Sequence, residues 1–409
     1  MEKFTIGDFC ITNQNSYTKN DKWDYVNYLD TGNITRNSID SIQQINLLYE
    51  KLPNRAKRKV RHNSIVYSTV RPNQRHYGII KEPLENFLVS TGFTVIDIND
   101  KVADADYLYY FLSQNEIVDH LQTIAEQSVS TYPSIKASDI EKLEIELPEI
   151  GVQRKVARIL SAFDKKIRNN IAINDNLEQQ AQAIFKSLFI DSPDEKNWSF
   201  GTFSDVIDGM IAGDWGKESP SGNNTEMVYC IRGADIPEVK MGNKGKMPTR
   251  YILSKNYSSK HLVDGDLVVE ISGGSPTQST GRIAAVSQSL LNRYDKGMIC
   301  TNFCKAMKPK AGYSMFVYYY WQYLYDRKVF FSYENGTTGI KNLDISGFIE
   351  SEPIVLPPPE LIVKFDRYCH AVFSNIFARG LENEKLAAVR DALIPRLMCG
   401  EVNVSKLNF

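Results

Sequence analysis

The sequence contains few of the residues that metal centres and disulfide-stabilised proteins need. Its 409 residues include only six cysteines, without a C-x-x-C pair, and five histidines, which argues against a zinc site and a disulfide framework. It has no run of 18 apolar residues and no basic-then-apolar start, so we predict a cytoplasmic protein without a membrane span. The formal net charge of −1 argues against a polycation that binds nucleic acid nonspecifically over its whole surface.

Motifs of catalysis and cofactor binding are also lacking. We find no G-x-x-x-x-G-K-[ST], no G-x-G-x-x-G after a strand, no H-E-x-x-H and no G-x-S-x-G. The nearest segment, "EISGGSPTQSTGRI" (270–283), has no lysine and no amphipathic helix after it, so we expect a flexible polar loop. Cys300 and Cys304 lie in one strand-like stretch, where their even spacing predicts two small buried hydrophobes on one face. The sequence therefore predicts no catalytic residue, metal or cofactor of its own.

What the sequence does contain is a long-period repeat. At an offset of 202, "YVNYLDTGNI" (25–34) aligns with "MVYCIRGADI" (227–236), and "NSIVYS" (63–68) aligns with "GDLVVE" (265–270). At an offset of 209, "ADYLYYFL" (105–112) aligns with "SMFVYYYW" (314–321), and Leu147-Pro148 aligns with Leu356-Pro357. Runs of apolar and β-branched residues predict strands, and the two aromatic segments predict short helices. We therefore predict two similar α+β units, each followed by a helical segment.

The two helical segments carry apolar residues at alternating three- and four-residue steps. The steps fall at Val156, Ile159, Phe163, Ile167, Asn170, Asn174, Leu177, Ala181, Ile184 and Leu188, and at Phe365, Tyr368, Val372, Ile376, Arg379, Asn383, Leu386, Arg390, Leu393 and Leu397. Helices of roughly 40 residues span about 60 Å, and we predict that they pack against each other, antiparallel, as a spacer. Polar residues in the seam favour one register, because a slipped alignment buries them unpaired. The alternative is that each helix packs on its own domain.

Pro395 should kink or end the second helix around Ile394.

Two acid-free basic stretches occupy corresponding positions in the repeat. Residues 51–81 contain nine Lys or Arg and two His, and residues 239–263 contain six Lys or Arg, with no acid in either stretch. One such stretch is usually a solvated face, but two at matching positions favour a surface that faces a polyanion. Lys and Arg supply phosphate contacts, whereas Asn, Gln and Arg read base edges. The candidate DNA-binding residues from these stretches and the loops beside them are Arg55, Lys57, Arg58, Lys59, Arg61, Arg71, Asn73, Gln74, Arg75, Lys244, Lys246, Arg250, Gln278 and Arg282.

This arrangement resembles the specificity subunit of type I restriction-modification enzymes. The most specific segments are "ELPEIGVQRKVARILSAFDKKIRNN" (146–170), "LPPPELIVKFDRYCHAVFSNI" (356–376) and the closing "LIPRLMCGEV" (393–402). "NGTTGIKNLDISGF" (335–348) is similar to that family's Gly/Ser/Thr-rich loop, which adds Thr337 and Lys341 as candidates. The resemblance covers nearly the whole chain. It implies target-recognition domains at 1–147 and 193–355 and helical spacers at 148–192 and 356–409.

The resemblance also implies a protein without catalysis of its own. Its partners would be double-stranded DNA, two methyltransferase subunits and ATP-driven restriction subunits, and S-adenosylmethionine, ATP and Mg²⁺ would bind those subunits only. Each recognition domain would read one half of a bipartite sequence, and the spacer would fix the unread gap. The absence of N-P-P-aromatic and D-P-P-aromatic motifs fits a targeting subunit.

Three alternatives stay open. The partner could be one chain that fuses methyltransferase and nuclease, the protein could be a self-sufficient methyltransferase or nuclease, or it could be a coiled-coil scaffold that binds no nucleic acid. Co-purification, turnover by the purified chain, and charge reversal at the basic stretch separate them.

Overall fold

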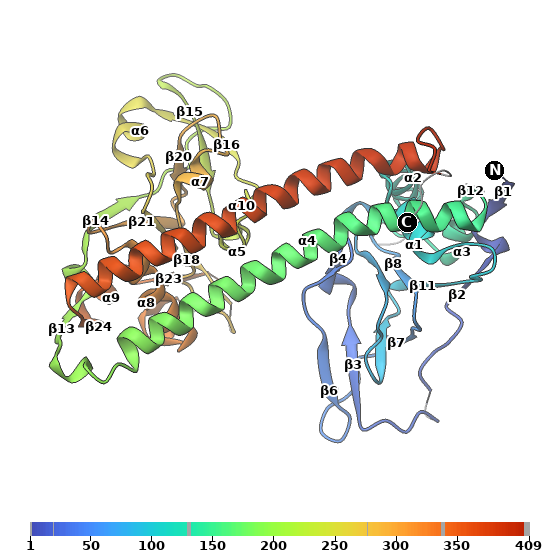
Figure 1. Ribbon diagram of the computed structural model, residues 1–409, viewed down its shortest axis with the longest axis horizontal. Coiled ribbons are helices and arrows are strands. Elements are labelled where there is room, and N and C mark those ends of the chain that lie inside the picture. The colour runs from blue at the N-terminus through green and yellow to red at the C-terminus, as the bar shows by residue number, and fades with distance from the viewer. Residues whose placement is uncertain (1, 19, 129–131, 276, 337–339, 405–409) are drawn as a thin grey trace. The chain divides into compact units, whose positions relative to one another are not determined.

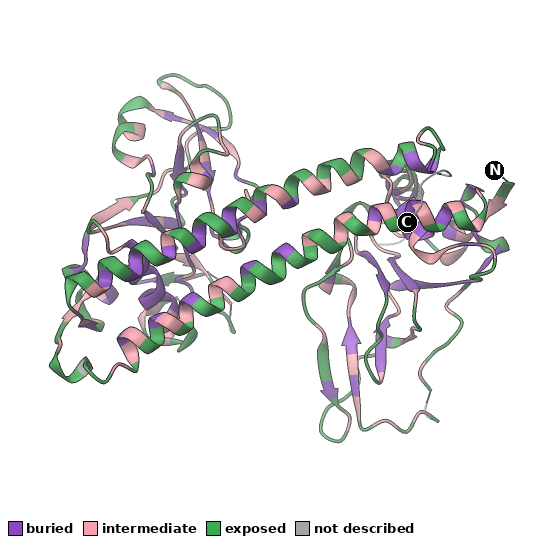
Figure 2. Ribbon diagram, in the orientation of Figure 1, coloured by how far each residue is buried: buried purple, intermediate pink, exposed green. Residues whose placement is uncertain are grey.

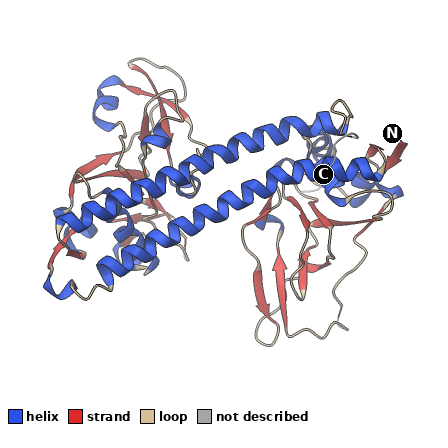
Figure 3. Ribbon diagram, in the orientation of Figure 1, coloured by secondary structure: helices blue, strands red, loops and turns tan. Residues whose placement is uncertain are grey.

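The computed structural model describes residues 2–18, 20–128, 132–275, 277–336 and 340–404. The chain divides into two compact units. Unit 1 consists of Met1–Lys165 and Ala387–Phe409, and unit 2 consists of Lys166–Leu386. Strands and helices occur in both units (Figure 3), as an α+β fold requires. The predicted fold class is confirmed.

The described residues of unit 1 include two four-stranded sheets and three short helices. Its strands are β1 (Glu2–Thr5), β2 (Cys10–Thr12), β3 (Tyr25–Leu29), β4 (Ile34–Thr35), β5 (Ser38–Ile39), β6 (Gln43–Asn46), β7 (Ala56–Lys59), β8 (Ser64–Ser68), β9 (Tyr77–Ile80), β10 (Phe87–Ser90), β11 (Phe93–Ile98) and β12 (Glu144–Leu147). Its short helices are α1 (Ala105–Ser113), α2 (Asn115–Glu126) and α3 (Ala137–Glu141). The sheet orders are β2-β11-β8-β9 and β6-β3-β10-β7, and β1 pairs with β12.

Unit 2 repeats this plan. Its strands are β13 (Ser199–Thr202), β14 (Ile207–Ala212), β15 (Asn224–Ile231), β16 (Thr249–Leu253), β17 (Leu267–Glu270), β18 (Ser272–Gly273), β19 (Ile283–Ala285), β20 (Met298–Cys300), β21 (Cys304–Pro309), β22 (Glu334–Asn335), β23 (Lys341–Leu343) and β24 (Pro353–Leu356). Its short helices are α5 (Ile236–Lys240), α6 (Ser254–Lys260), α7 (Gln288–Leu291), α8 (Ser314–Asp326) and α9 (Ile345–Ser351). The sheet orders are β14-β21-β17-β19, β16-β15-β20 and β18-β23-β22, and β13 pairs with β24.

Strand register confirms the sequence repeat. Ile65 on β8 pairs with Ile96 on β11, and its counterpart 202 residues later, Leu267 on β17, pairs with Met307 on β21. The parallel pair β3–β10 likewise corresponds to the parallel pair β15–β20. The two units thus share one scaffold, although the sequences of their loops differ.

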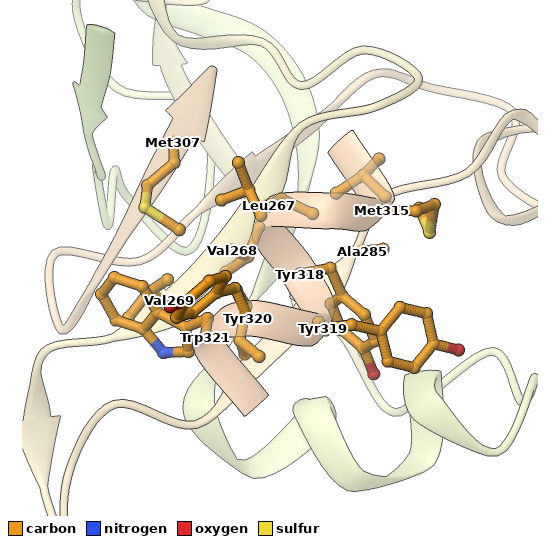
Figure 4. Close-up of a cluster of buried hydrophobic side chains, with 14 of the residues drawn as sticks. Leu267, Val268, Val269, Ala285, Met307, Met315, Tyr318, Tyr319, Tyr320 and Trp321 are labelled. Atoms are coloured by element: carbon orange, nitrogen blue, oxygen red, sulfur yellow. The ribbon is translucent and has the colours of Figure 1, made fainter. Parts of the chain in front are cut away.

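The core of unit 2 lies between α8 and the sheet that contains β17. Figure 4 shows the aromatic side chains of α8, among them Tyr320 and Trp321, facing the apolar side chains of β17 and Met307. Trp321 is fully buried, and its indole Nε1 donates to the Gly281 carbonyl at 2.7 Å. The tyrosine-rich sequence of α8 therefore serves packing.

Two long helices, α4 (Ile150–Phe185) and α10 (Pro359–Met398), contribute residues to both units (Figure 1). In unit 2 they contact each other in antiparallel order, since Asn170 meets Asn383 and Asn174 meets Ile376. In unit 1, Val156, Ala157 and Leu160 of α4 share a core with Ile394, Leu397 and Met398 of α10. Buried positions recur along one face of each helix (Figure 2). The antiparallel seam is therefore present within each unit.

Two seam positions were predicted wrongly. Tyr368 is exposed while Cys369 beside it is buried, and Arg379 is half-buried next to the buried Gly380. A Cβ on Gly380 would stand 1.9 Å from the Gly242 carbonyl oxygen, so the backbone of α10 approaches a loop of unit 2 at this point. A strict heptad pattern does not anticipate a close approach to a third segment.

Two further local predictions need correction. Cys300 ends β20 and Cys304 begins β21, so a turn at residues 301–303 separates them, although both are buried as predicted. Of the two outcomes predicted at Pro395, an end of the helix is wrong, because α10 continues through Pro395 to Met398, and a kink stays a prediction. The missing N–H of Pro395 removes one i→i−4 hydrogen bond, and only three residues of the helix follow it. Burial of Leu397 and Met398 in the unit 1 core stabilises the last turn.

Candidate nucleic-acid interface

The basic stretch of unit 1 forms β7 and its flanks. β7 pairs with β10 on one side, and on the other Tyr17 N donates to the Lys57 carbonyl at 2.7 Å. Arg55 and Lys57 are exposed. Lys59 lies 2.5 Å from an Asp21 carboxylate oxygen and 5.3 Å from the ring centroid of Trp23. Burial lowers the pKa of Arg58, whose Nε has no hydrogen-bond partner among the described residues. Arg55 and Lys57 thus face solvent, whereas Arg58 is partly buried and Lys59 is paired with Asp21.

Arg61 ties the start of β8 to the end of β11. Its Nε stands 3.1 Å from Asp97 Oδ1, and its Nη2 donates to the Ile98 carbonyl at 3.0 Å. Asp97 is buried and also accepts from Ser64 Oγ at 2.5 Å. Because the carboxylate is buried, losing Arg61 would leave it poorly compensated. Arg61 therefore supports the sheet.

The loop after β8 holds a polar tip in a fixed conformation. Arg71 and Arg75 have φ of 48° and 58°, in the left-handed region that non-glycine residues seldom adopt, and they bracket a 3-10 turn at Pro72–Gln74. Asn73 and Gln74 are exposed at the tip. Arg75 points back, donating from Nη2 to Asn115 Oδ1 at 2.7 Å. The turn thus presents Asn73 and Gln74 to solvent while Arg75 anchors it to the helices behind.

In unit 2 the first basic candidates stand in different surroundings. Lys244 Nζ lies 4.5 Å from the ring centroid of Tyr294. Lys246 is exposed, and its backbone N–H donates to Asp235 Oδ1 at 2.9 Å. Arg250 is buried, with its guanidinium carbon 3.8 Å from the ring centroid of Trp215 and Nη1 3.0 Å from Glu218. Lys246 is therefore the most accessible of these three cations.

The loop residues of unit 2 divide in the same way. Arg282 forms a two-bond ion pair with Glu270, at 2.8 and 2.6 Å, which raises the pKa of the guanidinium. Lys341 Nζ donates to Glu334 Oε2 at 2.8 Å. Gln278 is exposed at a turn that its carbonyl closes with Ser275 N at 2.7 Å. Thr337 lies outside the described residues.

Sequence reasoning therefore identified basic and amide residues on the surface loops but not their intramolecular partners. Arg55, Lys57, Arg71, Asn73, Gln74, Lys246 and Gln278 are exposed, whereas Lys59, Arg61, Arg75, Arg250, Arg282 and Lys341 have carboxylate or amide partners within their own unit. Two exposed aromatic residues, Trp215 and Phe303, were missed. Their signal in the sequence is a lone aromatic in a polar turn, "GDWGK" and "CTNFCK".

No group of three or more His, Cys, Asp or Glu side chains suited to a metal ion occurs in the part of the chain that the structure describes. Within the same residues, every helix is too short or too polar to cross a membrane.

Comparison with known proteins supports the resemblance found in the sequence. Residues 1–179 match the family model described as the type I restriction modification DNA specificity domain. Residues 1–179 are therefore similar to a type I specificity domain.

Two type I specificity subunits align with most of the chain. It is 23% identical over 480 residues to the HindI specificity subunit of Haemophilus influenzae, covering 98% of this chain and 99% of that protein. It is 28% identical over 351 residues to the MjaIX specificity subunit of Methanocaldococcus jannaschii, covering 81% and 76%. A type I S subunit from M. genitalium has the same fold, with a TM-score of 0.51, 16% identity, and 97% and 96% of the chains covered. The family model and these two relatives bear out the predicted resemblance to type I specificity subunits.

Proposed function

We propose that this chain is the DNA-reading specificity subunit of a type I restriction-modification complex, in which each unit reads one half of a bipartite target. The observation that carries the proposal is the shared strand order and register of the two units, combined with unlike exposed residues on their loops. A repeated scaffold with different surface residues is suited to two separate reading events. Sequence on the duplex is read by contacts to base edges, whereas cations contact phosphates and position the protein.

The exposed residues provide both kinds of contact. Arg55, Lys57 and Lys246 are exposed cations, which suits phosphate binding. Asn73, Gln74 and Gln278 stand on turns and carry amides that can pair with a base edge through two bonds. Three arginines position the loops in this assignment and do not themselves read bases. Arg61 and Arg282 are ion-paired, and Arg75 is hydrogen-bonded to the side-chain amide of Asn115.

The proposal places target-recognition domains at 1–147 and 193–355 and spacers at 148–192 and 356–409. The spacers would fix the length of the unread gap, because one continuous helix contributes to both units and inserted helical turns cannot be absorbed by a loop. The chain would have no catalysis of its own. Methyltransferase subunits that use S-adenosylmethionine and ATP-driven restriction subunits would supply the chemistry.

Methylation mapping tests this proposal most directly. The chain is expressed with its methyltransferase subunits in a host without other adenine methylation, and methylated adenines are mapped. We expect one bipartite motif. Replacing residues 1–147 with the corresponding domain of another specificity subunit should change one half only, and replacing 193–355 should change the other. A change in both halves after one exchange would contradict independent reading.

Charge reversal separates DNA reading from a scaffold role. Lys57→Glu should weaken binding of the assembled complex to all DNA sequences, and the salt slope should fall by roughly 0.9 for each phosphate that is no longer neutralised. Lys101→Glu, at an exposed lysine of unit 1 outside the basic stretch, is the matched control. Equal DNA binding by both variants and the wild type would favour a scaffold.

Two other outcomes correspond to the alternatives. Co-purification of a single chain that carries both methyltransferase and nuclease would change the partner. Turnover by the purified chain alone, with DNA and either S-adenosylmethionine or Mg²⁺, would make it an enzyme.

A further inference from the structure

A pocket of about 340 Å³ opens in unit 2 between two turns. Trp215, on the turn after β14, and Phe303, on the turn between β20 and β21, line it together with Glu270, Ser272 and Asn302. Trp215 and Phe303 are 38% and 52% exposed. A single exposed aromatic residue is ordinary, but two that line one pocket offer apolar area to a ligand.

The turn that carries Trp215 is firmly built. Asp214 N donates to the Cys300 carbonyl at 2.9 Å, and Asp214 Oδ1 accepts from Gly216 N at 3.1 Å. Gly216 has φ of +61°, and a Cβ there would stand 2.6 Å from the Tyr251 carbonyl oxygen, so glycine is required. The Arg250 guanidinium lies 3.8 Å from the indole centroid. The indole is therefore held in place before any ligand arrives.

The turn that carries Phe303 is equally constrained. The Phe303 carbonyl accepts from Ile271 N at 2.9 Å and from Ser272 N at 3.2 Å, and its own N–H donates to Thr301 Oγ1 at 3.2 Å. The backbone is thus fixed by three hydrogen bonds while half of the side chain stays in solvent. A fixed backbone therefore presents the Phe303 ring to the pocket.

Unit 1 has no such ring at the matching turn. Strand register makes Ile96 of unit 1 the counterpart of Met307 in unit 2. By the same alignment, the counterpart of Phe303 is Gly92. The shared scaffold therefore does not require an aromatic residue at this turn. Phe303 is one of the residues by which unit 2 differs from unit 1.

The side chains that line the pocket indicate which kind of ligand it can bind. Aromatic rings bind planar, polarisable groups by stacking, and the Asn302 amide suits a group with polar edges. The Glu270 carboxylate is paired with Arg282, and the Ser272 hydroxyl donates to Asn342. A nucleobase has both properties. Displacing a base from the duplex costs a few kcal/mol, which stacking on aromatic side chains offsets.

We propose that this pocket receives one nucleobase displaced from the stack in the half-site of unit 2, with Trp215 and Phe303 contacting its faces. The inference rests on the proposed function. It adds one base position of the half-site that is recognised after the base has left the duplex stack. Arg250 is a positioning residue here, because it holds the indole.

The test measures binding of the assembled complex to a duplex that carries the motif found by methylation mapping. Phe303→Ala and Trp215→Ala should each weaken binding by roughly 5- to 160-fold, the range for removal of one base–aromatic stack. Phe303→Tyr keeps the ring and should bind like the wild type, whereas Phe303→Leu should not. Phe200→Ala, at a 70%-exposed ring on β13, is the matched control and should have no effect.

Single mismatches placed along the half-site test displacement itself. One position should bind the wild type more tightly when mismatched, because a weakened pair is easier to open, and Phe303→Ala should lose that gain. Unchanged binding by Phe303→Ala, or no position where a mismatch tightens binding, overturns the inference and leaves the proposed function standing. A wild-type complex that binds no DNA overturns the proposed function. If Phe303→Ala melts below the wild type, the comparison of Phe303→Tyr with Phe303→Leu decides.

Discussion

The asparagine pair in the helical seam of unit 2 allows a quantitative prediction. Asn170 is fully buried, and its Nδ2 donates at 2.8 Å both to Asn383 Oδ1 and to Glu382 Oε2. Its Oδ1 accepts from Lys166 Nζ at 3.0 Å. Asn170→Leu removes these bonds and leaves the Asn383 amide, itself 8% exposed, facing an apolar side chain. We expect a loss of about 1–3 kcal/mol in the free energy of unfolding, the cost of an unsatisfied buried polar group.

The double variant separates two physical causes. Asn170→Leu with Asn383→Leu replaces both partners by apolar groups, which is often nearly neutral. We therefore expect it to recover most of the stability lost by the single variant. A double variant as unstable as the sum of the two single variants would refute the argument that the unpaired amide causes the loss.

The measurement must report on unit 2 alone. Three of the four tryptophans, Trp198, Trp215 and Trp321, belong to unit 2, so Trp23→Phe in all variants makes tryptophan fluorescence specific for it. For a unit of this size, about 1–3 kcal/mol corresponds to a fall in melting temperature of roughly 2–12 °C. If the seam asparagines specify register, the stable double variant should also methylate motifs with more than one gap length.

Other predictions concern packing, pH and thiol reactivity. Gly380→Ala should destabilise unit 2 by about 1–3 kcal/mol in urea unfolding, because its Cβ would meet backbone, whereas Gly151→Ala in α4 meets nothing within 4 Å and should be neutral or stabilising. The hydrogen bond to Asp366 raises the pKa of His370, so its contribution is present below about pH 6.5 and is lost as pH rises through the folded-state pKa. Because the His370 side chain is 40% exposed, the effect should stay below about 1 kcal/mol, and His370→Gln should remove it from the pH dependence of the melting temperature. A disulfide reagent at pH 8 should modify one thiol of the native protein rapidly and none in Cys399→Ser, since the other five cysteines are buried. Rapid modification of a second thiol would show that one of the buried cysteines is accessible.

The repeat and the seam could be predicted because both are visible as regular spacings in the sequence. The offset of 202 fixed which strands correspond, and the buried Asn170, Asn174 and Asn383 lie where the three- and four-residue steps placed them. Gly380 escaped prediction, because its contact with Gly242 depends on a loop that approaches from a distant part of the sequence.

The candidate interface was predictable in composition but not in accessibility. Charge and residue type identified the basic stretches, but the partners of Arg61 and Arg282 lie on other strands of the sheet. A guanidinium that is held by a carboxylate and one that faces solvent look alike in a sequence. The exposed Phe303 was missed for the opposite reason, because an aromatic residue in a β-rich stretch is usually assigned to the core.

The last described residues of the chain complete the core of unit 1. Ile394, Leu397, Met398 and Val404 pack in one cluster with residues from Ile6 onward. During synthesis on the ribosome, the first unit to emerge therefore lacks part of its interior until the rest of the chain has followed. A premature stop before Ile394 should harm the N-terminal unit, and a chaperone that shields the nascent chain would have to act until residues 394–404 have been synthesised.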